Sequence, residues 1–385
     1  MMGRVSIVRT GADLYAAFAE VVDGVAERLV ARGDRVLIKP NLVMPASPES
    51  GEITNPRVIE AAARYCLDCG AARVIIGEGP SYYMAESQLR ECFISTGVSE
   101  VARRLGVEWV LFDEHHYRTF RQISPYTPDE FRLTEFAFDC DKFINLPVLK
   151  THYLTTVTLA MKNLKGCLKR EDKPLFHNRD LARAVVELCK IIKPTANVID
   201  CTAKTTVRQF GYGYTAEKPR SGVSLLIAGS DIVAVDAVGC AVMGIEPDSV
   251  PTVVLGGQEG LGESDLTRIN IQGEEIKQLK IRLEVPRQHI QRAFPLLDIK
   301  GVEKACSGCL IPVVSSLLLL EKRGARLSRS MTICMGKNPE LPRDRALLLV
   351  GDCALLGDIN VRDWISGCPP CRESVLNALL QHMSW

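Results

Sequence analysis

The sequence has almost no net charge, few aromatic side chains and no long apolar run. A formal net charge of +1 gives the chain no overall field that would attract nucleic acid or an anionic membrane. Aromatic residues make up 6% of the chain, and the basic stretches contain few rings that could stack on nucleic-acid bases. The longest apolar stretch, residues 310–320, is about half a membrane span and is interrupted by Ser315 and Ser316. We therefore expect neither a nucleic acid nor a membrane as a partner.

Two familiar sequence signals are also missing. The N-terminus has no basic segment followed by an apolar run and a small-residue cleavage site, which predicts a cytoplasmic protein. No G-x-G-x-x-G loop lies between an expected strand and an expected helix, so we expect no nicotinamide cofactor. The glycines between residues 256 and 262 are more typical of a turn.

An α/β fold is indicated by short β-branched runs that alternate with amphipathic helical stretches. Strands that alternate with helices usually form a mainly parallel sheet with helices on both faces, and this is the fold class we predict. The composition, 46% apolar and 24% charged, is ordinary for a globular protein. The expected strands are residues 36–39, 73–77, 109–112, 142–146, 197–200 and 223–228, and the expected helices are 16–32, 55–68, 181–192 and 231–243.

The length of 385 residues favours two domains. Residues 272–300 are charged and weakly periodic, as expected of a passage between domains. We therefore predict a large α/β domain over residues 1–295 and a smaller cysteine-rich α/β domain over residues 296–385. The smaller domain should contain helices at 311–322 and 371–382 and strands at 330–334 and 346–350.

The cysteines are unevenly distributed. Of the fourteen in the chain, six lie in the last 80 residues. Since no secretory signal is seen, we interpret them as thiols or metal ligands rather than disulfides. The C-terminal set comprises Cys306-Ser-Gly-Cys309, Cys334, Gly351-Asp-Cys353 and Gly367-Cys368-Pro-Pro-Cys371.

This spacing favours a [4Fe–4S] cluster. A C-x-x-C turn places two sulfurs on one side of a loop, and neighbouring glycines allow backbone N–H groups to approach them. The Gly-Cys-Pro-Pro string resembles the cluster-binding string in small subunits of hydrogenases and of respiratory complex I. The favoured ligands are Cys306, Cys309, Cys353 and Cys368, with Cys371 as the alternative to Cys368.

Two other interpretations of these cysteines remain open. Structural zinc could use two C-x-x-C pairs, but these pairs are about sixty residues apart, longer than in an ordinary zinc ribbon. Redox-active or unliganded thiols are the other alternative. Cys334 lies in an apolar strand and is expected to be a buried thiol.

Polar residues follow several of the expected strands. Between residues 141 and 173, seven lysines and arginines face three acids, mixed with Asn, Thr, His and Gly. Because α/β folds bind ligands where their strands end, we predict a cleft for a small anionic substrate. The candidate catalytic residues are Lys150, His152 and Lys162, and the candidate substrate-binding residues are Lys39, Asn41, Glu78, Asn163, Lys165 and His177.

Five motifs in order resemble the DUF362 family over residues 4–260. They are Leu37-Ile-Lys-Pro-Asn-Leu-Val43, Gly77-Glu-Gly-Pro80, Leu149-Lys-Thr-His152, Ala160-Met-Lys-Asn-Leu-Lys-Gly166 and Asp231-Ile-Val-Ala-Val-Asp236. The resemblance implies iron–sulfur association and an anaerobic bacterial or archaeal setting, since members often carry a ferredoxin-like module with two four-cysteine runs. This sequence lacks the compact run, so the resemblance does not supply the ligands. It supplies no reaction either, since the family's label records an unknown function.

Three functional hypotheses follow. The first is a redox or cluster-assisted enzyme, an oxidoreductase or a lyase, acting on a small carboxylate or phosphate. The second is a non-catalytic electron or cluster carrier whose basic loop docks an acidic electron-transfer partner. The third is a zinc-stabilised binding protein.

Overall fold

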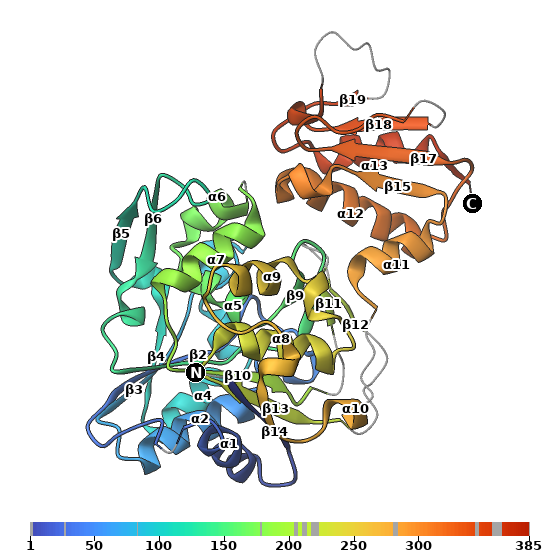
Figure 1. Ribbon diagram of the computed structural model, residues 1–385. Helices are drawn as coiled ribbons and strands as arrows, with labels where there is room; N and C mark the ends of the chain where they lie inside the picture. Colours follow the sequence, from blue (N-terminus) through green and yellow to red (C-terminus); the bar gives the residue numbers. More distant parts are fainter. Residues whose placement is uncertain are drawn as a thin grey trace.

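The computed structural model describes the chain except for residues 1–2, 27, 83, 178, 204–206, 210–213, 217–222, 280–283, 343–345, 356–363 and 385. It contains a large N-terminal part built on one sheet and a smaller C-terminal part with its own sheet (Figure 1). Within the described part of the chain, none of the helices has the length and apolar character needed to span a bilayer.

The main sheet has eight strands in the order β14-β1-β13-β10-β7-β2-β3-β4. β13 pairs antiparallel with both neighbours, β1 and β10, while every other pair in this sheet is parallel. The prediction of a mainly parallel sheet is therefore confirmed. The strands are β1 (Arg4–Arg9), β2 (Arg35–Lys39), β3 (Arg73–Glu78), β4 (Glu108–Leu111), β7 (Lys142–Asn145), β10 (Ala196–Cys201), β13 (Leu225–Gly229) and β14 (Asn270–Gly273).

Helices cover both faces of this sheet, as predicted (Figure 1). Each face has its own buried apolar cluster, which is why the central strands are apolar on both sides. One face carries α1 (Leu14–Asp23), α2 (Pro56–Asp68), α3 (Glu91–Ile94) and α4 (Val98–Leu105). The other carries α5 (Ala160–Asn163), α7 (Leu181–Ile191), α8 (Ile232–Val242) and α9 (Pro251–Gln258).

The helix expected over residues 16–32 is shorter than predicted. α1 ends at Asp23, and Gly24 is its C-cap. A Cβ atom at Gly24 would lie 2.7 Å from Ser6 Oγ on β1, so only glycine allows the helix end to approach the sheet this closely. The prediction was wrong for residues 24–26 and 28–32, because glycine favours a helix end and no pattern in the sequence reports this contact.

Smaller elements surround the carboxyl ends of the main strands. β5 (Tyr117–Arg121) and β6 (Glu130–Thr134) form a hairpin, and β8 (Lys150–His152), β9 (Thr156–Thr158), β11 (Val207–Gln209) and β12 (Tyr214–Ala216) form a second sheet. Two short helices, α6 (Lys173–His177) and α10 (Ile276–Leu279), complete the N-terminal part.

The C-terminal part has a parallel four-stranded sheet and its own apolar core. The sheet begins at Leu297, and the preceding helix α11 packs against α12. The strands are β15 (Leu297–Lys300), β17 (Met331–Met335), β18 (Ala346–Val350) and β19 (Trp364–Ile365), with β16 (Arg326–Leu327) and β20 (Met383–Ser384) as a separate pair. The helices are α11 (Pro286–Ala293), α12 (Ser307–Lys322) and α13 (Arg372–Leu380).

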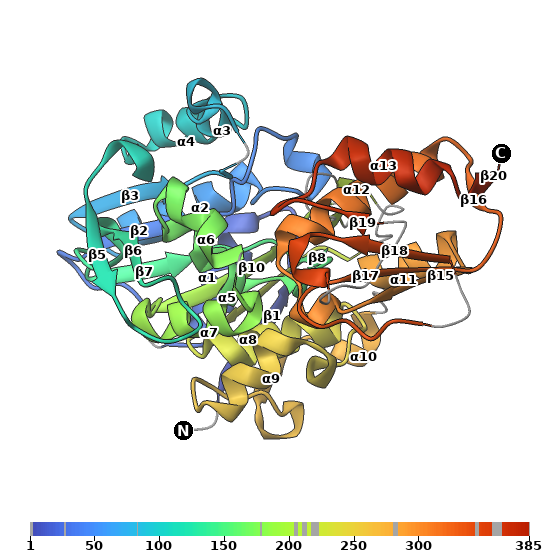
Figure 2. The same ribbon diagram turned by 90° about the horizontal axis from the view of Figure 1, so that it is seen from above.

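The loop after β8 joins the two parts. Tyr153 is buried in the C-terminal apolar core, and Leu154 packs against the same core. The C-terminal sheet therefore sits over the end of the molecule that carries β8 (Figures 1 and 2). This brings the cysteine-bearing segment to the edge at which the main strands end.

Candidate functional site

Polar side chains gather where β2, β3 and β7 end, and Lys39 and Glu78 form a buried ion pair there. Lys39 Nζ lies 2.8 Å from Glu78 Oε1, and both side chains are almost fully shielded from solvent. Glu78 also accepts the backbone N–H groups of Leu42 and Gly79. The positive charge of Lys39 is thus balanced within the protein, and this side chain does not line the cavity described below.

A chain of buried hydrogen bonds runs from Lys150 into the centre of the sheet. Lys150 Nζ donates to Asn41 Oδ1 at 2.8 Å, and Asn41 Nδ2 donates to Asn163 Oδ1 at 2.7 Å. Asn163 Nδ2 then donates to Asn145 Oδ1 at 2.8 Å, and Asn145 Nδ2 donates to Asn197 Oδ1 at 2.9 Å. Since each amide is fixed at both ends, Asn41 and Asn163 present a rigid polar surface.

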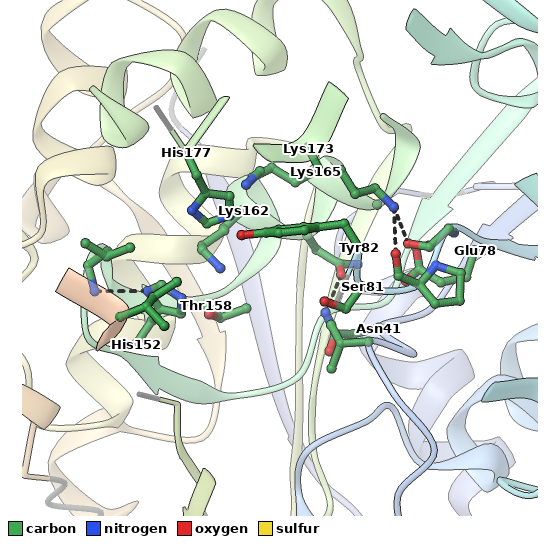
Figure 3. Close-up of a pocket in the computed structure, with 17 residues that line it drawn as sticks. Asn41, Glu78, Ser81, Tyr82, His152, Thr158, Lys162, Lys165, Lys173 and His177 are labelled. Carbon is green, nitrogen blue, oxygen red and sulfur yellow. Dashed lines mark hydrogen bonds between the residues drawn. The ribbon is translucent and has the colours of Figure 1, made fainter. Parts of the chain in front are cut away.

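A cavity of about 100 Å³ opens above this surface (Figure 3). Of the candidate site residues, Asn41, Glu78, His152, Lys162, Asn163, Lys165 and His177 line it, whereas Lys39 and Lys150 lie behind its wall. The cavity is also lined by four residues that were not predicted as site residues, Ser81, Tyr82, Lys173 and Ile311. The position of Tyr82 just after the β3 end is the one signal that could have pointed to this residue.

The side-chain amines of two lysines in the cavity wall have no hydrogen bond or ion pair within the described residues. Lys162 is half-buried and Lys165 is 8% exposed. Burial lowers the pKa of Lys162 to about 7. Burial, followed by the charges of Lys162 and Lys173, holds the pKa of Lys165 well below its usual range. Both amines are therefore costly to protonate.

Further cations surround these two amines. Burial, and then the charge of Lys162, lowers the pKa of Lys150 to about 7. Lys173 Nζ donates to the carbonyl oxygens of Gly79 and Pro80, and burial lowers its pKa as well. Among the described lining residues, Glu78 is the only carboxylate, and Lys39 already neutralises it. The cavity is therefore lined by several basic groups and, in the part of its wall that the structure describes, by no carboxylate that lacks a cationic partner.

The two histidines in the wall are held in their neutral form. Burial, and then the charge of Lys162, holds the pKa of His152 well below its usual range. Nδ1 of His152 accepts the backbone N–H groups of Leu154 and Thr155, which assigns its proton to Nε2. Burial and the charge of Lys165 also lower the pKa of His177, whose ring lies 5.7 Å from that of Tyr82.

The short helix that carries Lys162 is anchored from the neighbouring helix α8. Asp236 on α8 is buried, and its carboxylate accepts the backbone N–H groups of Ala160 at 2.7 Å and Met161 at 3.1 Å. These are the first two residues of α5, whose N–H groups have no partner within the helix. Asp236 thus fixes the position from which Lys162 enters the cavity.

Replacement of Asp236 with alanine is expected to lower the free energy of unfolding by about 2–4 kcal/mol, because two buried N–H groups lose their acceptor. Chemical denaturation of the purified protein measures this loss. Asp13→Ala is the matched control, since Asp13 caps α1 through one exposed bond to Ala16, and its loss should cost about 1 kcal/mol. Equal losses in the two variants would contradict the anchoring role.

The candidate metal centre lies in the C-terminal part. Cys306 is the N-cap of α12, and Cys309 lies in the first turn of that helix. Cys353 follows β18 in a turn over Asp352–Ala354, Cys368 lies between β19 and α13, and Cys371 is the N-cap of α13. Cys334 is buried on β17, as predicted.

Four of these cysteines lie close together. A hydrogen bond with Cys306, then burial, then the charges of Cys306, Cys353 and Cys368 raise the pKa of Cys309. Burial and the charges of Cys306 and Cys353 also raise the pKa of Cys368. Cys371 is not among these neighbours. The structure thus groups the four sulfurs of the favoured ligand set.

The backbone approaches two of the sulfurs closely. A Cβ atom at Gly351, whose φ is +88°, would lie 2.3 Å from Cys309 Sγ, and one at Gly308 would lie 3.3 Å from Cys306 Sγ. Among the described residues, no three Cys, His, Asp or Glu side chains are grouped tightly enough to hold one metal ion. A zinc ion needs its sulfurs about 2.3 Å from one centre. An iron–sulfur cube binds each cysteine at a separate iron, so its ligands stand further apart.

The two sites share helix α12. Ile311, two residues beyond Cys309, lines the lysine cavity. The N-terminal end of α12, from the N-cap Cys306 to Ile311, therefore carries two cysteines and part of the cavity wall.

The model of a domain of unknown function (DUF362) matches residues 36–241. The chain belongs to the DUF362 family. The match confirms the family predicted from the motifs and includes every predicted pocket residue, from Lys39 to His177. It ends before the C-terminal cysteines, which are therefore interpreted from the structure.

Two individual proteins are similar to this DUF362 chain. The thylakoid-associated protein sll1697 of Synechocystis sp. (strain ATCC 27184 / PCC 6803 / Kazusa) is 31% identical over 239 residues, which are 60% of this chain and 70% of that protein. The lactate racemase apoprotein from Thermoanaerobacterium thermosaccharolyticum matches at 14% identity with a TM-score of 0.41, over 64% of this chain and 58% of that one. The chain thus spans less than two thirds of the racemase.

Proposed function

We propose that this DUF362 protein binds a small anion in the lysine cavity, beside an iron–sulfur cluster held by Cys306, Cys309, Cys353 and Cys368, and acts on that anion as a redox or cluster-assisted enzyme. The observation that carries the proposal is the pair of unbonded amines, Lys162 and Lys165, in a cavity whose wall includes the helix that carries Cys306 and Cys309.

The charge of the cavity supports an anionic ligand. Lys162 and Lys165 have no hydrogen-bond acceptor within the described residues, although burial makes an unsatisfied ammonium costly. A carboxylate or phosphate would supply the missing negative charge and the acceptor oxygens. A volume of about 100 Å³ limits the ligand to a few heavy atoms, since one water needs about 10–15 Å³ by the same measure.

The chemistry of the four cysteines fits a [4Fe–4S] cluster. They come from three separate loops, and glycines at 308 and 351 leave room for backbone around the sulfurs of Cys306 and Cys309. When bound, such a cluster would supply electrons or an iron that accepts a ligand oxygen. Lys162, with a pKa of about 7, can hold or release a proton near neutral pH beside the bound anion.

The electron-carrier hypothesis has one observation in its favour. Cys353, Cys368 and Cys371 are exposed, so a cluster at this position would lie near the surface and within reach of a partner protein. Anion binding separates the two functions, because a pure electron carrier has no need of the lysine cavity.

Sulfate binding is expected to weaken as the pH rises above about 7. Lys162, which lines the cavity, has a pKa of about 7 in the free protein, so it must take up a proton to pair with an anion at higher pH. Uptake of one proton lowers the affinity about tenfold per pH unit. Isothermal titration calorimetry from pH 6 to pH 9 at constant ionic strength measures this, and sulfate keeps its charge over that range.

The control for this titration is Lys169→Ala. Lys169 belongs to the same basic segment but pairs with Glu171 at the surface, so its loss should leave sulfate affinity unchanged. A sulfate affinity that does not vary with pH contradicts this assignment.

Without ligand, the stability of the protein should show the opposite trend with pH. The free energy of unfolding should rise between about pH 7 and pH 10, because lysines in the unfolded chain keep protons that the folded protein has released.

A further inference from the structure

We infer that Lys162 forms a covalent imine with a small oxo acid, a compound that carries both a carbonyl group and a carboxylate. The inference rests on the proposed anion-binding function and narrows its substrate class. It follows from the position of the Lys162 amine relative to the other cations of the cavity.

Lys162 is the common neighbour of the basic groups in the site. Its charge acts on Lys150 and His152 of β8, on Lys165 and on His177 of α6. Figure 3 shows its amine directed into the cavity, between His152 and Tyr82. An electrophile held in this cavity would therefore meet the Lys162 amine.

The lysines at this site fall into two classes. Lys39, Lys150 and Lys173 each place Nζ on a protein oxygen, which fixes the amine and uses its hydrogens. Lys162 and Lys165 have no such bond within the described residues. Lys165 is 8% exposed, whereas Lys162 is half-buried and more accessible from the cavity opening. Lys162 is therefore placed to react, and Lys165 to pair with the carboxylate of the same molecule.

A nucleophilic lysine must be neutral, and the cavity meets this need. With a pKa of about 7, about half of the Lys162 amines are uncharged at neutral pH, whereas an ordinary lysine with a pKa near 10.4 is almost entirely protonated. Desolvation beside other cationic groups is the established way to activate a lysine for attack on a carbonyl.

The reaction is a condensation with no change of oxidation state. The Lys162 nitrogen forms a bond to the carbonyl carbon, and the amine transfers its two hydrogens to the carbonyl oxygen. That oxygen leaves as water, and a C=N bond remains. His152, with Nδ1 occupied by backbone donors and its proton on Nε2, can pass a proton to the departing oxygen.

The walls restrict the size of the oxo acid. Val43, Leu154 and Ile311 provide apolar surface, and the volume of about 100 Å³ admits a molecule of only a few heavy atoms. A three- or four-carbon oxo acid meets these limits, and its carboxylate supplies a negatively charged partner for Lys165.

Reductive trapping tests the inference. The full-length protein is incubated with pyruvate and sodium cyanoborohydride, and the modified residue is located by intact-mass and peptide mass spectrometry. The expected result is one adduct per chain at Lys162, formed at least about ten times faster than with acetone, which lacks the carboxylate. Sulfate should slow the reaction by occupying the same cavity.

Lys162→Arg is the matched variant, because it keeps the positive charge but lacks a nucleophilic amine. Its circular-dichroism spectrum and unfolding midpoint should match those of the wild type, which shows that it is folded, and it should give no adduct. An adduct on Lys165, labelling spread over surface lysines, or no adduct at all would overturn the inference. If sulfate still binds in that case, only the imine is wrong; if sulfate does not bind either, the anion site itself is wrong.

Discussion

Replacement of Cys368 with alanine is expected to remove most of the iron and sulfide from the protein. The wild type, purified without oxygen, should contain about four iron and four acid-labile sulfide per chain. Cys368 lies close enough to Cys306 and Cys353 for their charges to raise its pKa, so its loss should leave the cluster with three ligands. Iron and sulfide analysis with a visible spectrum should show less than about one quarter of the wild-type content.

Cys371→Ala is the control, because Cys371 is equally exposed and belongs to the same loop. Its iron content should equal that of the wild type, since Cys371 lies outside the group of four. The opposite result would exchange the two ligands, and equal losses would mean that the whole loop had been disturbed. A colourless wild type with stoichiometric zinc would end the cluster proposal and favour structural zinc.

The sequence predicted the central strands of the main sheet because they are apolar on both faces. β3 carries the run Val74-Ile-Ile76, which is buried and follows a helical stretch, a pattern with few other interpretations. β14 is short and largely exposed at the sheet edge, so it carries no such pattern and was not predicted. The reversed direction of β13 follows from its tertiary pairing, which no local pattern reports.

The residues selected after strand ends lie close together in the structure, because parallel strands bring their carboxyl ends to one edge of the sheet. The sequence does not report the direction of each side chain. Whether a lysine enters the cavity depends on its partner, however. The ion pair with Glu78 keeps Lys39 out of the cavity, and the hydrogen bond to Asn41 keeps Lys150 out of it. Ile311 could not be predicted as a lining residue, since it comes from the C-terminal part of the fold.

Lys162→Ala is expected to weaken sulfate binding about 10- to 100-fold while leaving the iron content of the protein unchanged. One charge-assisted hydrogen bond in a buried site contributes about 1.5–3 kcal/mol, which corresponds to this range. The neighbouring pKa values should shift too, because the charge of Lys162 lowers those of Lys150, Lys165 and His152. Calorimetry with sulfate and iron analysis of the same preparation provide the two readouts.

The pairing of Lys162→Ala with Cys368→Ala decides whether the two sites are separate. Lysine is not a cluster ligand, so a loss of iron in Lys162→Ala would mean that the cavity supports the fold of the cysteine loops rather than a ligand. Loss of sulfate binding in Cys368→Ala would mean that the cavity depends on the cysteine site. Because Ile311 is part of the cavity wall and lies two residues beyond Cys309, an empty cysteine site could release the first turn of α12 and open the cavity. If Cys368→Ala loses iron but keeps sulfate binding, and Lys162→Ala loses sulfate binding but keeps iron, the protein has two independent sites joined by one helix.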